Sequence, residues 1–301
     1  GAAAGAIGDV AMAEFKKLST KDFLTLYHFF GLLWTNAFVQ ACAMLTVSSC
    51  ACIWYWCPTK GGSKDLPDGP LRTSIWRTCR YHLGTAAFGS LIIAIVQFIR
   101  AIFMYIDKQT QGLQKANKMV KVLMKSIQCC MYCLEKCLKF ITLNTYIITA
   151  LKGSSFCFSM KEAFGLIMSN LAQVGIFQFV SMIVMLLGKL FIIAGTSVIL
   201  YFSMPMYVGS GKQVNNSFAM IFINIILSYF IGTTFLSVYS TCISTILLNF
   251  CVDKKENCGS AEKPYFMSKS LANITGCKNE AGVTTEKPAG AKKGGSKKDI
   301  I

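Results

Sequence analysis

The chain has 301 residues, of which 53% are hydrophobic and only 15% charged, with a formal net charge of +16. Soluble domains usually carry about a quarter charged residues, so this composition argues against an ordinary soluble domain. No base-stacking platform or groove-binding motif accompanies the positive charge, which argues against a nucleic-acid binder. The composition predicts an all-α, polytopic integral membrane protein. We expect a helical bundle whose outer surface contacts the lipid bilayer.

Four long apolar stretches contain none of the 14 acidic residues. Each is longer than the roughly 20 residues that a helix needs to cross the hydrocarbon core. A charge left unpaired in that core costs several kcal/mol, which explains the exclusion of carboxylates. We therefore predict a membrane domain over residues 29–250, and its transmembrane spans are expected at about 29–56, 83–106, 181–205 and 217–250.

Residues 107–140 form a segment of a different kind. Lysines recur there at helical spacing from Lys115 to Lys125, with apolar residues between them. This pattern predicts a basic amphipathic helix on the inner membrane surface. The alternative is that 126–151 is a fifth crossing, which would reverse the sidedness of everything upstream.

The distribution of Lys and Arg predicts the orientation of the spans. If both ends of the chain are cytoplasmic, four spans put 22 of these residues inside and 6 outside, which is the bias that the positive-inside rule expects. We therefore predict a cytoplasmic lead, 1–28, and a cytoplasmic tail, 251–301. The tail becomes rich in Lys and Gly after about residue 281, a composition typical of disorder. The chain begins at Gly1 with neither Met nor a basic leader segment, so we expect a fragment without a signal peptide.

Many short strings, in a fixed order over residues 29–275, resemble the choline transporter-like proteins, solute carrier family 44. They are RYH at 80–82 with Gly84, LIIAIVQFIR at 91–100, CCMYCLEKCLKF at 129–140, LNTYIITA at 143–150, GSSFCFSMKEAF at 153–164, GKL at 188–190, SVY at 237–239 and SAEKPYFMS at 260–268.

The resemblance implies transport of choline or a related amine cation by alternating access, at the plasma membrane or at an organellar membrane. It also implies a missing N-terminal half, because family members carry further spans and a large extracellular loop before this region. Two alternatives stay open: a carrier of another solute such as thiamine pyrophosphate, and a non-transporting membrane scaffold. No phosphate-binding loop or nucleophile motif is present, so we expect no enzyme activity and no cofactor.

Aromatic side chains in the spans are the candidates for binding the substrate. A quaternary ammonium cannot donate a hydrogen bond, so its site relies on the faces of aromatic rings. The candidate rings are those of Trp34, Tyr81, Tyr229 and Tyr239. Trp34 ranks first, because the polar side chains of Asn36 and Gln40 lie within two helical turns of it. The alternative for each ring is packing or a place at the membrane interface.

Polar side chains inside the spans should face protein or water. Gln97 and Arg100 share a helix face at a spacing of three. Arg100 would repel a cationic substrate, so we predict a structural or gating role in which a carboxylate from elsewhere pairs with it. Snorkelling of Arg100 to the interface is the alternative. His82 is a candidate proton relay, with an interfacial histidine as the alternative.

The 14 Cys residues suggest modification rather than metal binding. Cys129, Cys130 and Cys133 lie on the predicted amphipathic helix and are candidates for palmitoylation, with plain packing as the alternative. Cys57 and Cys79 flank the first loop and are a candidate disulfide if that loop is extracellular. Only two His residues exist, far apart in sequence, so we expect no metal centre.

Overall fold

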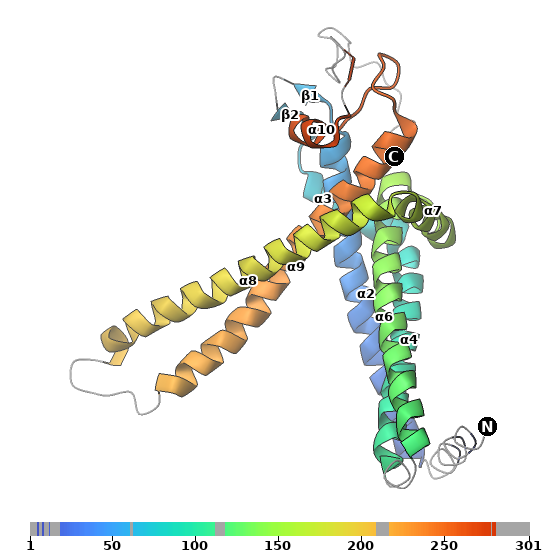
Figure 1. The fold of residues 1–301 in the computed structure, drawn as a ribbon, viewed down its shortest axis with the longest axis vertical. Coiled ribbons are helices and arrows are strands. Elements are labelled where there is room, and N and C mark those ends of the chain that lie inside the picture. The colour runs from blue at the N-terminus through green and yellow to red at the C-terminus, as the bar shows by residue number, and fades with distance from the viewer. Residues whose placement is uncertain are drawn as a thin grey trace. The chain divides into compact units, whose positions relative to one another are not determined.

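The computed structural model describes residues 5, 8, 12, 19–60, 63–111, 118–208, 217–277 and 279–280. Within these residues the regular structure is helical except for a two-stranded antiparallel hairpin, β1 (Thr59–Lys60) and β2 (Ser63–Lys64). The helices are α2 (Thr20–Trp56), α3 (Pro70–Arg77), α4 (Leu83–Gln109), α6 (Lys118–Lys152), α7 (Phe156–Ser169), α8 (Leu171–Val208), α9 (Ser217–Glu256) and α10 (Lys269–Thr275), and a π-helical turn, Thr78–His82, links α3 to α4 (Figure 1). The predicted disorder after about 281 lies outside the described residues.

Four segments are long and apolar enough to cross a membrane, which confirms the all-α, polytopic membrane class. They are Thr20–Trp56, Pro70–Gln109, Leu171–Met204 and Phe218–Glu256. The helix of the fourth segment, α9, runs unbroken through Gly232. Its length therefore exceeds what one upright crossing needs, so α9 is either tilted or extends beyond the hydrocarbon core.

The chain divides into two compact units. They are Gly1–Thr46 with Leu71–Phe164, and Val47–Pro70 with Gly165–Ile300. In the first unit α4 and α6 lie side by side, and in the second α8 and α9 lie side by side (Figure 1). Each unit therefore contains a pair of long helices that lie near each other in the sequence, α4 with α6 and α8 with α9.

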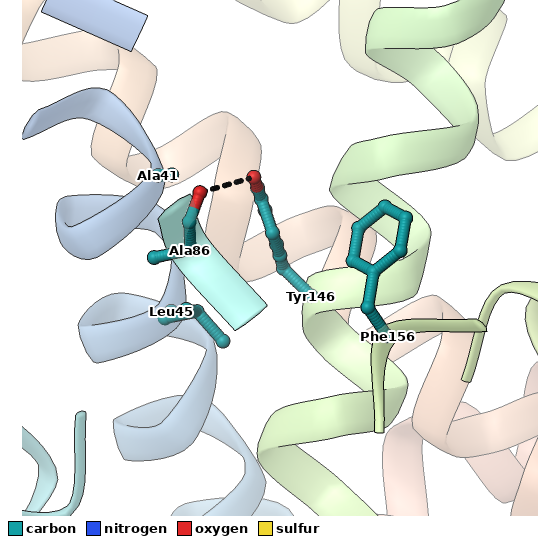
Figure 2. Packing of buried hydrophobic residues seen from close by; sticks show 5 residues of the cluster. All are labelled: Ala41, Leu45, Ala86, Tyr146 and Phe156. Carbon is teal, nitrogen blue, oxygen red and sulfur yellow. Dashed lines mark hydrogen bonds between the residues drawn. The ribbon is translucent and has the colours of Figure 1, made fainter. Parts of the chain in front are cut away.

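The core of the first unit gathers where α2, α4, α6 and α7 meet. Figure 2 shows its buried side chains, which are Ala41, Leu45, Ala86, Tyr146 and Phe156. The hydroxyl of Tyr146 donates a hydrogen bond to the carbonyl oxygen of Ala86, 3.5 Å away. Alanines on α2 and α4 leave room for the two aromatic rings, so these rings fill the space where the helices pack.

At Gly89 the backbone of α4 lies directly against the rings of Tyr146 and Phe156. A Cβ added there would lie 2.7 Å from Cε2 of Phe156 and would also overlap the hydroxyl of Tyr146. Gly84, one and a half turns earlier on α4, has nothing within 4 Å of such a Cβ. Close packing of α4 against Tyr146 and Phe156 therefore requires glycine at 89 and not at 84.

The corner between α6 and α7 is built from the string GSSFCFSMKEAF. Gly153 ends α6 with a positive φ of 67°, and its N–H donates to the carbonyl of Thr149 at 2.8 Å, as helix-ending glycines commonly do. Lys152 then forms an ion pair of 2.6 Å with Glu162. The hydroxyl of Thr149 donates to that of Ser159 at 2.9 Å. This string therefore has a structural role at the corner.

A polar seam joins α8 and α9 in the second unit. The hydroxyls of Thr196 and Ser228 lie 2.9 Å apart, and the amide of Asn224 donates to the hydroxyl of Ser197 at 3.1 Å. Such interhelical hydrogen bonds are a usual means of holding helices together in lipid. The apolar side chains of both helices are largely exposed, as expected for surfaces that lipid or further helices cover.

We predict that Gly89→Ala lowers the free energy of unfolding by about 1–3 kcal/mol, because the added methyl group overpacks the core. The matched control, Gly84→Ala, should be neutral or up to about 1 kcal/mol more stable, because alanine favours the helix. Denaturant titration of the purified protein in detergent measures both. Equal stability of the two variants would contradict the packing described for Gly89.

Candidate functional site

A buried carboxylate, Glu135 of α6, is the centre of the polar contacts between α4 and α6. Its side chain is 9% exposed and pairs with the guanidinium of Arg100. Lys139 donates to Glu135 Oε1 at 2.7 Å, and the amide of Gln97 donates to the same oxygen at 3.1 Å. The predicted carboxylate partner of Arg100 is therefore Glu135, and Gln97 shares it, as their common helix face suggested.

Two cations surround this single carboxylate, so the cluster carries a net positive charge. The ring of Tyr132 lies 5.1 Å from the Arg100 guanidinium carbon and 5.4 Å from the ammonium of Lys136, which adds cation–π contacts on the same side. An amine cation would be repelled here. The arrangement instead holds the charged side chain of Arg100 on α4 against the buried carboxylate of Glu135 on α6.

Trp34 lies in an aromatic environment on the first unit. Its indole N–H donates to the carbonyl of Ala87 on α4 at 3.3 Å, which fixes the ring. Phe30 is 6.5 Å from Trp34 and 5.4 Å from Phe98 between ring centres. A shallow cleft of about 400 Å³ is lined by Trp34, Phe30, Tyr27 and their neighbours on α2.

The two polar residues predicted to accompany Trp34 bond to each other. The amide of Gln40 donates to the side-chain oxygen of Asn36 at 3.2 Å, along the exposed side of α2. Neither Asn36 nor Gln40 is among the residues that line the Trp34 cleft. A role for this pair in substrate binding stays a prediction.

Tyr81 belongs to the first unit with Trp34 but does not line the Trp34 cleft, and the remaining aromatic candidates belong to the second unit. Tyr81 has the guanidinium of Arg80 over its ring at 5.6 Å, and Tyr229 has the ammonium of Lys189 over its ring at 5.7 Å. Tyr239, like Tyr229, belongs to the second unit and is 65% exposed. Two of these rings therefore already hold cations of the chain itself.

His82 and the cysteines keep the status of predictions. His82 is half-buried at the end of the π-helical turn before α4. The palmitoylation candidates Cys129, Cys130 and Cys133 are exposed thiols on α6. Cys57 and Cys79 are both free thiols and belong to different units, so the disulfide between them also stays a prediction. Among the described residues, no group of three or more His, Cys, Asp or Glu is placed to hold a metal ion.

A second buried carboxylate, Asp253 near the end of α9, was not anticipated from the sequence. Its Oδ2 accepts the hydroxyl of Tyr55 at 2.9 Å, and the backbone N–H groups of Phe266 and Met267 at 2.9 and 3.1 Å. Its Oδ1 accepts the amide of Asn257 at 2.7 Å. Asp253 is fully buried, and these four donors satisfy the charge that burial would otherwise make costly.

Lys64 of strand β2, in the loop after α2, binds the same backbone segment as Asp253. Its ammonium donates to the carbonyl oxygens of Tyr55, Cys57 and Phe266 at 2.8, 2.9 and 2.8 Å. The carbonyl of Tyr55 lies in the last turn of α2 and that of Cys57 directly follows the helix, so Lys64 caps α2 as basic residues often do. Burial lowers the pKa of Lys64, and the nearby Asp253 carboxylate opposes the shift. The string SAEKPYFMS is therefore the segment that Asp253 and Lys64 bind.

We predict that Glu135→Gln costs about 1–3 kcal/mol of stability, because it leaves Arg100 and Lys139 without their counter-ion. The double variant Arg100→Gln/Glu135→Gln should recover part of this loss, since it removes the stranded guanidinium as well. Glu262→Gln, at an exposed position, is the control for loss of a carboxylate. Denaturant titration in detergent of the double variant and of both single variants, Glu135→Gln and Arg100→Gln, gives the coupling energy. A double variant no more stable than Glu135→Gln would contradict the pairing.

Comparisons with known proteins agree with the resemblance noted in the strings. The family model described as plasma-membrane choline transporter matches residues 4–255. The chain is 38% identical over 262 residues to choline transporter-like protein 2 of Danio rerio, covering 86% of this chain and 37% of that protein. It is 38% identical over 264 residues to choline transporter-like protein 4 of Homo sapiens, covering 86% and 37%.

A more distant organism gives the same result. Choline transporter-like protein 2 of Dictyostelium discoideum is 39% identical over 250 residues, covering 82% of this chain and 38% of that protein. The chain thus spans little more than a third of the length of these relatives. The matched residues include both long helix pairs and most of the aromatic and charged residues described above. The chain belongs to the choline transporter-like family.

Proposed function

We propose that this protein transports choline or a related amine cation across the plasma membrane by alternating access. The observation that carries the proposal is the family match over residues 4–255, together with four helices long and apolar enough to span a membrane. Because the chain spans little more than a third of its relatives, we propose that transport requires a further, N-terminal half. That half would supply the other walls of the substrate cavity.

The Trp34 cleft is our proposed contribution of this chain to substrate binding. Tryptophan binds cations more strongly than the other aromatic residues, and a quaternary ammonium needs ring faces rather than acceptors. The rings of Tyr81 and Tyr229 hold Arg80 and Lys189. Among the described residues no cation of the chain lies over the ring of Trp34, whose aromatic neighbour is Phe30. The residues that line the cleft all come from α2, so α2 forms one wall of the proposed site.

The proposal predicts that Trp34→Ala, in a version of the protein that includes the N-terminal half, raises the KM for choline about 5- to 30-fold. This is the effect of losing a cation–π contact of about 1–2 kcal/mol. Trp34→Phe should lose less, because it keeps a ring face. Radiolabelled choline uptake, measured against concentration, gives KM for each variant.

Trp76→Ala is the matched control, because Trp76 is an exposed tryptophan on α3 that does not line the cleft. Its KM should equal that of the parent protein at comparable surface expression. An unchanged KM in Trp34→Ala would remove Trp34 from the site. An equal rise in both tryptophan variants would indicate a general effect on the fold.

We also propose that α6 crosses the membrane as a fifth span. The support comes from Lys64, in the loop after α2, which donates a hydrogen bond to Phe266 in the tail at 2.8 Å. Two segments in direct contact outside the spans lie on the same side of the membrane, so an even number of crossings separates them. The helices α4, α8 and α9 supply three, and α6 supplies the fourth.

The length and contacts of α6 are compatible with this role. It has 35 residues, more than a crossing requires, and its buried Glu135 is paired with Arg100 of α4. In this arrangement the lead and the tail lie on opposite sides. The tail holds ten of the chain's 30 Lys and Arg, which favours a cytoplasmic tail. The loop after α2 is then cytoplasmic too, a compartment that disfavours the disulfide between Cys57 and Cys79.

Sidedness distinguishes the five-span arrangement from the four-span one. Single cysteines replace Asp65, Gln111 or Glu262 in a background without other cysteines, and an impermeant maleimide is added to intact cells. Five spans predict labelling at 111 and protection at 65 and 262. Four spans with cytoplasmic ends predict labelling at 65 and protection at 111 and 262. Labelling after permeabilisation confirms that each position is reactive.

A further inference from the structure

A second cleft, of about 540 Å³, lies between α4 and α6 and has the opposite character to the Trp34 cleft. Three cations line it, Arg100, Lys108 and Lys125, against a single carboxylate, Asp107. Its remaining lining includes apolar side chains such as those of Phe103 and Met131. A cleft with excess positive charge at one part and apolar walls elsewhere suits an amphiphilic anion.

The positions of the two lysines place the charge near the end of the helix pair. Lys108 lies in the last turn of α4, which ends at Gln109. Lys125 lies eight residues into α6, which begins at Lys118. The end of a long apolar helix is the depth at which basic side chains meet lipid headgroups. Arg100 lies about two turns deeper along α4.

The charges of the two lysines are available for a ligand. The carboxylate of Glu135 is taken by Arg100, Lys139 and Gln97. Among the described residues, no carboxylate forms an ion pair with Lys108 or Lys125. An anion bound between these two ammonium groups would gain charge-assisted hydrogen bonds.

We propose that this cleft binds the phosphate group of a membrane phospholipid. The phosphate lies between Lys108 and Lys125, and an acyl chain follows the apolar wall that includes Phe103 and Met131. A free phosphate would leave that wall unused, and an amine cation would be repelled. The site is separate from the proposed choline site and does not depend on transport.

Binding of a short-chain phospholipid tests the proposal on the purified 301-residue chain in detergent. The probe is dioctanoyl phosphatidylglycerol, and its affinity is measured by native mass spectrometry. Lys108→Gln/Lys125→Gln should weaken binding at least tenfold. The matched control, Lys121→Gln/Lys161→Gln, removes the same charge at exposed positions outside the cleft and should change affinity less than twofold.

Two further ligands distinguish the source of the phosphate. Dioctanoylglycerol, which lacks the phosphate, should bind at least tenfold more weakly than the phospholipid, and inorganic phosphate should not compete with the phospholipid at millimolar concentration. Equal weakening in both double variants, equal binding of dioctanoylglycerol, or effective competition by inorganic phosphate would each overturn the proposal. Unfolding temperatures without lipid, unchanged in the cleft variant, show that it is folded. If that variant is unstable, Lys125→Gln alone replaces it, with Lys121→Gln as its control, and should weaken binding at least threefold.

Discussion

The second unit depends on the burial of one carboxylate, that of Asp253. A buried carboxylate is tolerated only when donors surround it, because an unsatisfied charge away from water costs several kcal/mol. Tyr55, Asn257 and two backbone N–H groups of the tail provide those donors. The end of α2, the end of α9 and the segment after α9 must therefore fold together. Lys64 adds the complementary cation, which binds carbonyls of the same segments.

In the first unit the buried carboxylate of Glu135 is likewise surrounded by donors. One helix supplies the acid, the neighbouring helix supplies Arg100 and Gln97, and Lys139 adds a second cation from the next turn of α6. Among the described residues none of these charged groups bonds to Trp34, whose indole N–H donates to the carbonyl of Ala87. This separation matters for the proposed transport of an amine cation, because fixed positive charge beside an aromatic site would repel the cation. The Trp34 cleft meets that condition, and the cleft beside Arg100 does not.

The amino-acid sequence was sufficient for the membrane class, because exclusion of carboxylates from long apolar stretches has one physical cause. It also indicated that Arg100 needs a carboxylate, although it did not identify Glu135. That residue lies in a helix too polar for a composition-based assignment of a span, with Lys136 and Lys139 beside it. Charged side chains that pair with one another in three dimensions appear as separate charges when they are read along the chain.

Other contacts of the candidate site have no recognisable pattern in the amino-acid sequence. The polar segment after α9 resembles an unstructured tail, and its bonds to Asp253 run through backbone N–H groups that any residue offers. The cations over Tyr81 and Tyr229 depend on side-chain directions rather than on spacing. Asn36 and Gln40 were expected to accompany Trp34, but their helical spacing of four lets them bond to each other.

We propose that this chain provides one part of a choline carrier whose substrate cavity needs walls from a further half. Radiolabelled choline uptake into cells tests it most directly, comparing this chain with a longer version from the same locus at matched surface expression. We expect saturable uptake by the longer version and none by this chain alone. Absence of saturable uptake by both versions would contradict the assignment of choline as the substrate, and equal uptake by both would contradict the need for a further half.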